Sequence, residues 1–224
     1  MKRINILSIC SILMIILLLS CGKDNYEAPN ATLTGKVTYN GTPVGVRGSN
    51  NSVRLQLWQN GFELKNPIDV YVTQDGSFSA ALFNGNYKLI TVPGNGPWKI
   101  VTDTLDINVN GNTDIEFPVE LYYSLKDVKY QLNGNNLIAT LNIQKLDPTK
   151  SLDDISLLIG KTKFVDLGLF IKREIKSGDS EGNITLSLDI GSELQSNPTL
   201  FARVAVKING ITEALYDPNI HQVK

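Results

Sequence analysis

The chain has 224 residues, a formal net charge of −1, one histidine and two cysteines. The charge is close to balanced and the sequence has no basic stripe that would attract a phosphate backbone, so we expect no nucleic-acid partner. Cys10 and Cys21 are the two cysteines, so the chain beyond residue 21 has no thiol for a disulfide framework, a thiolate zinc site or a cysteine nucleophile. With one histidine besides, we expect neither a metal centre nor a cofactor.

The first twenty residues have the anatomy of a secretory signal. Lys2 and Arg3 precede an apolar run that starts at Ile6, and Ser20 is the small residue before Cys21. The stretch LLSC that ends at Cys21 resembles a bacterial lipobox, in which the cysteine is acylated, for example with palmitate, and becomes the new N-terminus. We expect residues 1–20 to be a signal peptide and Cys21 to carry lipid. An ordinary secretory signal or a short membrane helix is the alternative.

Residues 21–30 are polar and aperiodic, which is typical of a tether between a lipid and a folded domain. Lys23 and Asp24 resemble in part the short charged signal that sends Bacteroidetes lipoproteins to the outer face of the outer membrane. A plain solvated linker is the alternative. We expect a lipid-anchored protein of the outer membrane at the cell surface, with the periplasmic face as the alternative location.

Strand patterns begin at Ala31. In the run Val53 to Trp58, aliphatic residues alternate with polar residues and a tryptophan, and the run Ile68 to Thr73 repeats this alternation. Such a period of two predicts sheets with one buried face. Asn-Gly or Asp-Gly turn signals follow the strands at residues 40–41, 75–76, 84–85 and 110–111.

The second half repeats this style. Alternating runs at 137–143, 184–190 and 200–208 are accompanied by Gly-containing turns, and Asn209-Gly210 is a strong hairpin signal. A helical turn is expected to start at Ser192. The whole pattern predicts an all-β chain with two antiparallel β-sandwich domains in tandem, at 31–120 and 121–224, the second immunoglobulin-like or fibronectin-like.

An ordered set of residues in the first domain carries a family resemblance. The set consists of Gly35-x-Val37, Gly41-x-Pro43, the strand Val53 to Leu57, Asp75-Gly76-x-Phe78 and Gly85-x-Tyr87-x-Leu89. It resembles the carboxypeptidase-regulatory-like, transthyretin-like β-sandwich, a module that is not the catalytic domain of its family. Together with the lipobox and the second all-β half, the chain resembles a Bacteroidetes lipoprotein of the domain of unknown function 3823 family. This resemblance implies a role beside an outer-membrane glycan transporter.

Catalytic chemistry finds little support in the sequence. His221 lies three residues from the end, where a terminal or strand-end histidine is the simpler interpretation of a lone imidazole. The acid pairs Asp153-Asp154 and Asp179 with Glu181 lie in loop-like sequence, whereas glycosidase chemistry needs two carboxyls on a rigid frame. We therefore expect no catalytic residues.

The two tryptophans are the candidate glycan contacts. Trp58 has the strand parity opposite to the aliphatic residues of its run, so it is expected to point outward. Trp98 follows a Gly-Asn-Gly-Pro stretch at a loop or strand start. Exposed rings stack on the apolar face of a sugar. The alternative is that Trp98 closes the sandwich edge and that Trp58 packs on the neighbouring domain.

These observations favour a non-catalytic, membrane-anchored lipoprotein that assists an outer-membrane glycan capture and uptake system. Its expected partners are the membrane, through the lipid on Cys21, an outer-membrane nutrient transporter complex and a glycan. A structural or adhesive, fimbria-like surface component is the alternative function, because a lipobox followed by two sandwiches also describes that class.

Overall fold

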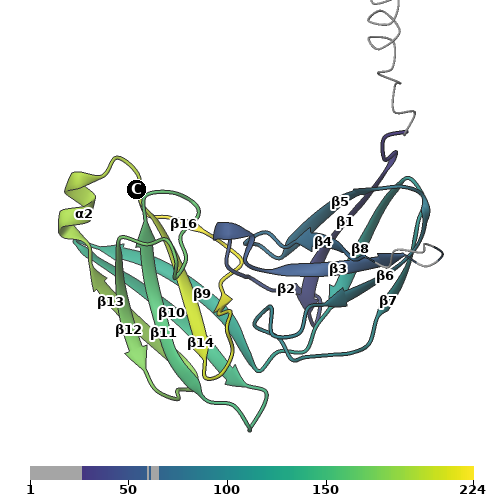
Figure 1. Cartoon of the computed structure of the whole chain (residues 1–224). Helices are drawn as coiled ribbons and strands as arrows, with labels where there is room; N and C mark the ends of the chain where they lie inside the picture. The colour runs from purple at the N-terminus through teal and green to yellow at the C-terminus, as the bar shows by residue number, and fades with distance from the viewer. Residues whose placement is uncertain (1–26, 60, 62–65) are drawn as a thin grey trace, which may run out of the picture.

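The computed structural model describes residues 27–59, 61 and 66–224. The expected signal peptide and Cys21 lie outside the described residues. Figure 1 shows two β domains joined directly to each other, and the prediction of an all-β fold with two domains is confirmed. Within the described part, the helices are all too short or too polar to cross a membrane.

The first domain contains two sheets of four strands each. One sheet is built on β1, which pairs with β2, β5 and β8, and the other has the order β4-β3-β6-β7. The strands are β1 (Ala31–Tyr39), β2 (Thr42–Pro43), β3 (Arg54–Gln59), β4 (Ile68–Tyr71), β5 (Ser77–Leu82), β6 (Gly85–Thr91), β7 (Leu105–Val109) and β8 (Asn112–Pro118). A 3-10 turn, η1 (Ser49–Asn51), precedes β3.

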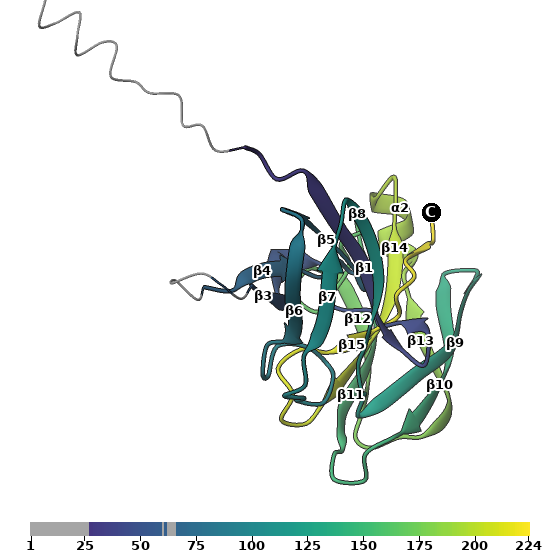
Figure 2. The same cartoon turned by 90° about the vertical axis from the view of Figure 1, so that its right-hand side faces the viewer.

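One pairing in this domain departs from the expected antiparallel pattern. β1 pairs antiparallel with β5 on one side and parallel with β8 on the other, over Thr32 to Thr38. The cause is the turn at Asn110-Gly111, which carries the chain from β7 in one sheet to β8 in the other, so that β8 enters its sheet along β1. Figure 2 shows β1 and β8 side by side, with residues 27–30 leading into β1.

The second domain also contains two sheets. One has the order β13-β10-β9, and the other has the order β12-β11-β14-β15 with β16 added to β14. The strands are β9 (Tyr123–Asn133), β10 (Asn136–Lys145), β11 (Leu152–Gly160), β12 (Lys172–Ser177), β13 (Gly182–Asp189), β14 (Phe201–Ile208), β15 (Leu215–Tyr216) and β16 (His221–Gln222). A short helix, α2 (Gly191–Ser196), includes the expected turn at Ser192.

The hydrophobic core follows the predicted alternation in most strands. Leu55 and Leu57 on β3 are wholly buried, as are Leu137 and Ala139 on β10. β14 is different, because residues of both parities are buried from Phe201 to Val206. Its second face packs under the segment after β11 and under β15, in a separate small cluster that includes Val165, Ala214 and Tyr216.

The two domains are joined by backbone as well as by side chains. The backbone N–H of Tyr216 in the second domain donates to the carbonyl oxygen of Gly45 in the first (3.0 Å), which makes an isolated antiparallel bridge. A Cβ atom on Gly45 would lie 2.3 Å from the Tyr216 carbonyl oxygen, so this close approach requires glycine. The junction is therefore part of the folded core.

Candidate functional site

Trp58 lies on the outer face of the sheet β4-β3-β6-β7. Its neighbours Leu55 and Leu57 are wholly buried, and alternation along β3 turns Trp58 to the other side, where it is partly exposed. In the sheet register Trp58 is opposite Lys88 on β6, and Lys88 is opposite Asp106 on β7. The indole therefore lies beside a row of polar side chains on the sheet surface.

The surroundings of Trp58 form a shallow hollow of about 350 Å³. Nζ of Lys88 lies 2.5 Å from Oδ1 of Asp106, and Nδ2 of Asn108 donates to Oδ1 of Asn86 (2.7 Å). In the described part of the chain, this amide pair leaves one NH₂ group and one carbonyl oxygen for a further partner. A partly exposed indole beside paired amides is an arrangement that can hold a sugar ring and its hydroxyls.

The same face continues toward the second domain. Nε2 of Gln56 donates to Oδ1 of Asp69 (3.1 Å), and Nε of Arg54 lies 3.5 Å from the same oxygen. Arg54 is opposite Tyr71 in the register of β3 and β4, and the Tyr71 side chain is exposed. The outer face is therefore polar along its length, with Trp58 near one end and Tyr71 at the other.

Trp98 occupies a different environment from Trp58. It is only 4% exposed, forms an isolated bridge with Leu121, and packs so closely on Gly96 that a Cβ there would lie 2.2 Å from the ring. The structure therefore corrects the candidate contact at Trp98, since a ring this deeply buried has no face for a sugar. Its position agrees with the alternative reading, in which Trp98 closes the sandwich edge.

His221 lies in β16 and is partly buried. Its ring stacks on Tyr130, with centroids 4.9 Å apart and planes 8° from parallel, and burial lowers the pKa of His221. The Tyr130 hydroxyl donates to Oδ2 of Asp217 (2.9 Å). Among the hydrogen bonds of the described residues, none joins His221 to a serine hydroxyl, so the imidazole is packed and is not set up to activate a nucleophile.

The carboxylate of Asp179 is held in its ionised form. Hydrogen bonds from Lys145, from the hydroxyl of Tyr123 and from the backbone N–H of Leu152 lower the pKa of Asp179 to about 2. A general acid needs a raised pKa, so these contacts are structural. Within the described residues, no group of three or more His, Cys, Asp and Glu side chains could hold a metal ion.

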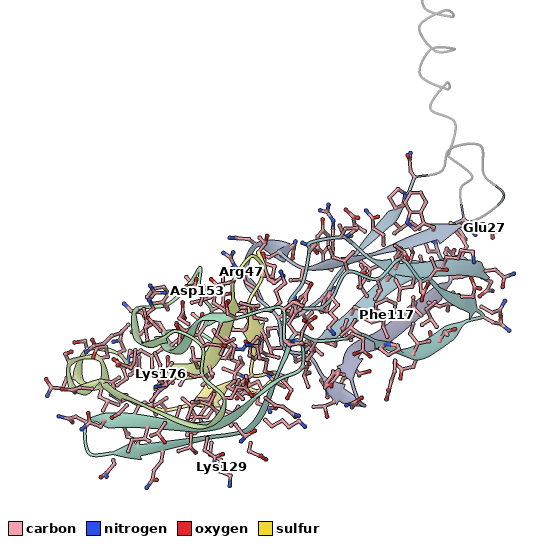
Figure 3. The ribbon with its side chains drawn as sticks, turned by 90° about the horizontal axis from the view of Figure 1, so that it is seen from below. Glu27, Arg47, Phe117, Lys129, Asp153 and Lys176 are labelled. Carbon is pink, nitrogen blue, oxygen red and sulfur yellow. The ribbon has the colours of Figure 1, made fainter. Side chains whose placement is uncertain are left out.

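The domain junction contains polar residues that sequence reasoning missed. Asp166 is wholly buried; its Oδ2 accepts the backbone N–H of Ser49 (2.9 Å), and Nε of Arg47 lies 3.7 Å from its Oδ1. Figure 3 shows Arg47 between the two domains. On the second domain, Arg203 is wholly buried. Its signal in the sequence is a charged residue in the middle of the apolar run 200–208.

Two family models match these two domains. The model described as the N-terminal domain of a protein of unknown function (DUF3823) matches residues 31–120. The model described as a domain of unknown function (DUF3823_C) matches residues 123–220. The chain belongs to the DUF3823 family.

Solved structures agree with this membership. A DUF3823 family protein from Parabacteroides merdae is 36% identical, with a TM-score of 0.83 over 88% of this chain and 100% of that chain. A DUF3823 family protein from Bacteroides ovatus is 34% identical, with a TM-score of 0.79 over 87% of this chain and 98% of that chain. No curated protein matches the chain.

A third solved structure shares the fold at lower sequence identity. It is described as a "putative carbohydrate binding protein" from Bacteroides uniformis, is 19% identical, and has a TM-score of 0.70 over 88% of this chain and 99% of that chain. At this identity the likeness shows a shared two-domain fold.

Proposed function

We propose that this DUF3823 protein is a non-catalytic, glycan-binding lipoprotein of an outer-membrane glycan capture and uptake system. The observation that carries the proposal is the outer sheet face of the first domain, where Trp58 stands beside the Asn86–Asn108 amide pair. The description of the Bacteroides uniformis relative supports the same class of ligand. In this proposal the first domain is a carboxypeptidase-regulatory-like module that serves as a binding surface.

The chemistry of this face suits a carbohydrate. A sugar ring offers an apolar face of C–H bonds and a rim of hydroxyls, and the hollow offers an indole with amide donors and acceptors at its edge. The charged groups of the face, Lys88 with Asp106 and Arg54 with Asp69, are paired with each other. A neutral glycan therefore fits the face better than a strongly acidic one.

Affinity electrophoresis of a soluble chain beginning at residue 22 tests the binding proposal. We expect retardation in gels that contain a neutral polysaccharide, loss of retardation for Trp58→Ala, and partial retention for Trp58→Phe. Phe83→Ala is the matched control, because Phe83 is an aromatic residue 48% exposed outside the outer face. Equal mobility of the wild type and Trp58→Ala in gels with every polysaccharide tested would contradict the proposal. Equal binding of the two proteins to every sugar on a printed glycan array would contradict it as well.

The membrane anchor is proposed to be lipid on Cys21. Two or more acyl chains on one cysteine give stable attachment, whereas one chain binds only marginally. We expect Cys21→Ser to leave the membrane fraction and to lose metabolic labelling with radioactive palmitate. Protease treatment of intact cells then distinguishes the two faces: digestion places the domains at the cell surface, and protection places them in the periplasm.

The absence of enzyme activity is part of the proposal. The stacked His221 and the ionised, hydrogen-bonded Asp179 support it. We expect no release of reducing sugar when the protein is incubated with polysaccharides that it binds. Release that disappears in Asp179→Asn or His221→Asn would show that the protein is an enzyme.

A structural or adhesive role is the second candidate function. It is favoured by three consecutive apolar side chains that are exposed just before β12: Leu169, Phe170 and Ile171, each 37–49% exposed. Patches of this kind mark contact surfaces, either for a filament neighbour or for a transporter. Loss of surface filaments on gene deletion would support the structural role, and unchanged filaments would reject it.

A further inference from the structure

A groove lies at the junction of the two domains, at the Tyr71 end of the outer face. Its volume is about 480 Å³, within the range of ligand pockets. The first domain supplies Asn51, Tyr71, Gln74 and Asp75, and the second domain supplies Phe164 and Ile220. Neither domain alone contains the whole groove.

Two aromatic rings stand exposed in this groove. Tyr71 is 43% exposed and Phe164 is 55% exposed. The other hollow at the junction, of about 430 Å³, is also lined by residues of both domains, but its Tyr216 is only 1% exposed. The groove with Tyr71 and Phe164 therefore presents two exposed rings to a ligand, whereas the other hollow has the buried ring of Tyr216 and the half-buried ring of Tyr39.

Polar groups accompany the two rings. The carboxylate of Asp75 accepts hydrogen bonds from the hydroxyls of Thr73 (2.6 Å) and Ser77 (2.8 Å), which fix its position. Oε1 of Gln74 is buried and has no hydrogen-bond partner among the described residues. Rings with carboxylate and amide groups at their edge repeat the chemistry of the Trp58 hollow.

The walls of the groove are fixed before any ligand arrives. The hydrogen bond from Ser49 to Asp166 joins η1 to the segment that carries Phe164. Nη2 of Arg203 donates to the carbonyl oxygen of Gln74, in the wall itself. Because the groove is already formed, binding costs little conformational entropy in the protein, and this favours affinity.

The groove and the Trp58 hollow belong to one surface. Tyr71 is opposite Arg54, and Trp58 lies four residues further along β3. At about 3.3 Å per residue this is roughly 13 Å, longer than one sugar ring. The polar pair Gln56 and Asp69 lies between them.

We propose that the groove is a second glycan subsite, and that one neutral oligosaccharide chain lies along the outer face from Trp58 to Tyr71 and Phe164. This inference rests on the proposed glycan-binding function and adds the length of the ligand. A monosaccharide reaches one subsite only, whereas a longer oligosaccharide contacts both. Once one end of the oligosaccharide is bound, the other end is held near the second subsite at a high effective concentration, so the overall affinity rises.

The test uses the soluble chain from residue 22 with Tyr71→Ala, Phe164→Ala and Trp58→Ala variants, and with Phe83→Ala as the control. Starch, xylan and galactomannan serve as neutral probes and pectin as the acidic probe, in affinity electrophoresis. Calorimetry with oligosaccharides of two to eight sugars from the retained polysaccharide gives the length dependence. Tyr71→Phe keeps the ring, and circular dichroism of each variant checks that it is folded.

We expect affinity to rise at least tenfold between the shortest and the longest oligosaccharide. Tyr71→Ala and Phe164→Ala should abolish this rise and leave binding of the shortest sugars unchanged, and Tyr71→Phe should retain it. If binding is lost in Trp58→Ala and unchanged in Tyr71→Ala and Phe164→Ala, the groove is not a subsite and the Trp58 hollow alone binds the glycan. No retardation of the wild type by any probe would reject the proposed glycan-binding function itself. Stronger retention in pectin than in the neutral polysaccharides would contradict the proposal that the ligand is neutral.

Discussion

Nη2 of Arg203 donates a hydrogen bond to the backbone carbonyl oxygen of Gln74 (2.5 Å), across the junction between the domains. Nε of the same side chain donates to the carbonyl oxygen of Asp217 (2.8 Å), and its guanidinium lies 4.5 Å from the centroid of the Tyr216 ring. Burial lowers the pKa of Arg203 to about 10. A buried cation therefore ties the backbones of both domains together.

Replacement of this arginine should weaken the whole chain. Arg203→Met leaves the buried carbonyl oxygen of Asp217 without its donor and removes one of two hydrogen bonds to the carbonyl oxygen of Gln74, which still accepts from the backbone N–H of Val46 (3.2 Å). An unpaired buried acceptor costs about 1–3 kcal/mol, so we expect the free energy of unfolding to fall by about 1–3 kcal/mol. Urea unfolding followed by circular dichroism measures the change. Arg173→Met is the control, since Arg173 is exposed on β12 over the Phe170 ring. Similar effects of the two substitutions would contradict this account of Arg203.

Gly45→Ala should separate the domains. The new Cβ would lie 2.3 Å from the Tyr216 carbonyl oxygen, and this atom is backbone and cannot rotate away. We expect a loss of about 1–3 kcal/mol, two unfolding transitions in calorimetry, and new protease cleavage between residues 120 and 123. Gly85→Ala is the control, because its nearest neighbour is the end of the Gln59 side chain (3.1 Å). A single transition and an uncut junction in Gly45→Ala would show that the bridge is dispensable.

The two tryptophans should differ in stability and in solvent access. Trp98→Ala removes a buried ring, so it should cost about 3–5 kcal/mol, whereas Trp58→Ala should cost clearly less. In Trp58→Phe the remaining Trp98 should resist acrylamide quenching, and in Trp98→Phe the remaining Trp58 should be quenched. Equal quenching of both fluorophores would overturn the assignment of buried and exposed rings.

Asp179 should support stability at neutral pH and lose this effect in acid. Its pKa is lowered to about 2 in the folded chain, so the unfolded chain binds its proton first as pH falls. The stabilisation is full above pH 4 and disappears between about pH 4 and pH 2. The side chain is 44% exposed, so solvent screening limits the effect to about 1 kcal/mol or less.

The measurement compares the wild type with Asp179→Asn by urea unfolding at pH 7, 4 and 2. The difference between them should narrow as the pH falls. Asp153→Asn is the matched control, since its exposed side chain accepts no hydrogen bond within the described residues. A constant difference from pH 7 to pH 2 would mean that the carboxylate contacts of Asp179 contribute nothing.

Strand parity predicted the environment of Trp58 and could not predict that of Trp98. Trp58 belongs to a regular run in which Leu55 and Leu57 define the buried side. Trp98 follows Gly96 and Pro97, where the backbone has no period to extrapolate. Its burial depends on the tertiary bridge to Leu121, which no local pattern encodes.

The same limit applies to the junction. Alternation along β14 correctly identified Ala202, Val204 and Val206 as one buried face. It left Arg203 on the opposite face, and that face is buried because β15 and the neighbouring domain cover it. The groove escaped prediction for a related reason: Tyr71 and Phe164 are 93 residues apart in the sequence and meet only because the domains dock.

The position of β1 has a mechanical consequence. The expected tether enters the first domain at Ala31, the start of β1, and this strand is hydrogen-bonded to β5 on one side and to β8 on the other. A pull along the tether, such as drag on the domains outside a cell would produce, loads both ladders in shear over most of the strand. The bonds then share the force together, and a surface protein held in flow would resist being unravelled from its anchored end.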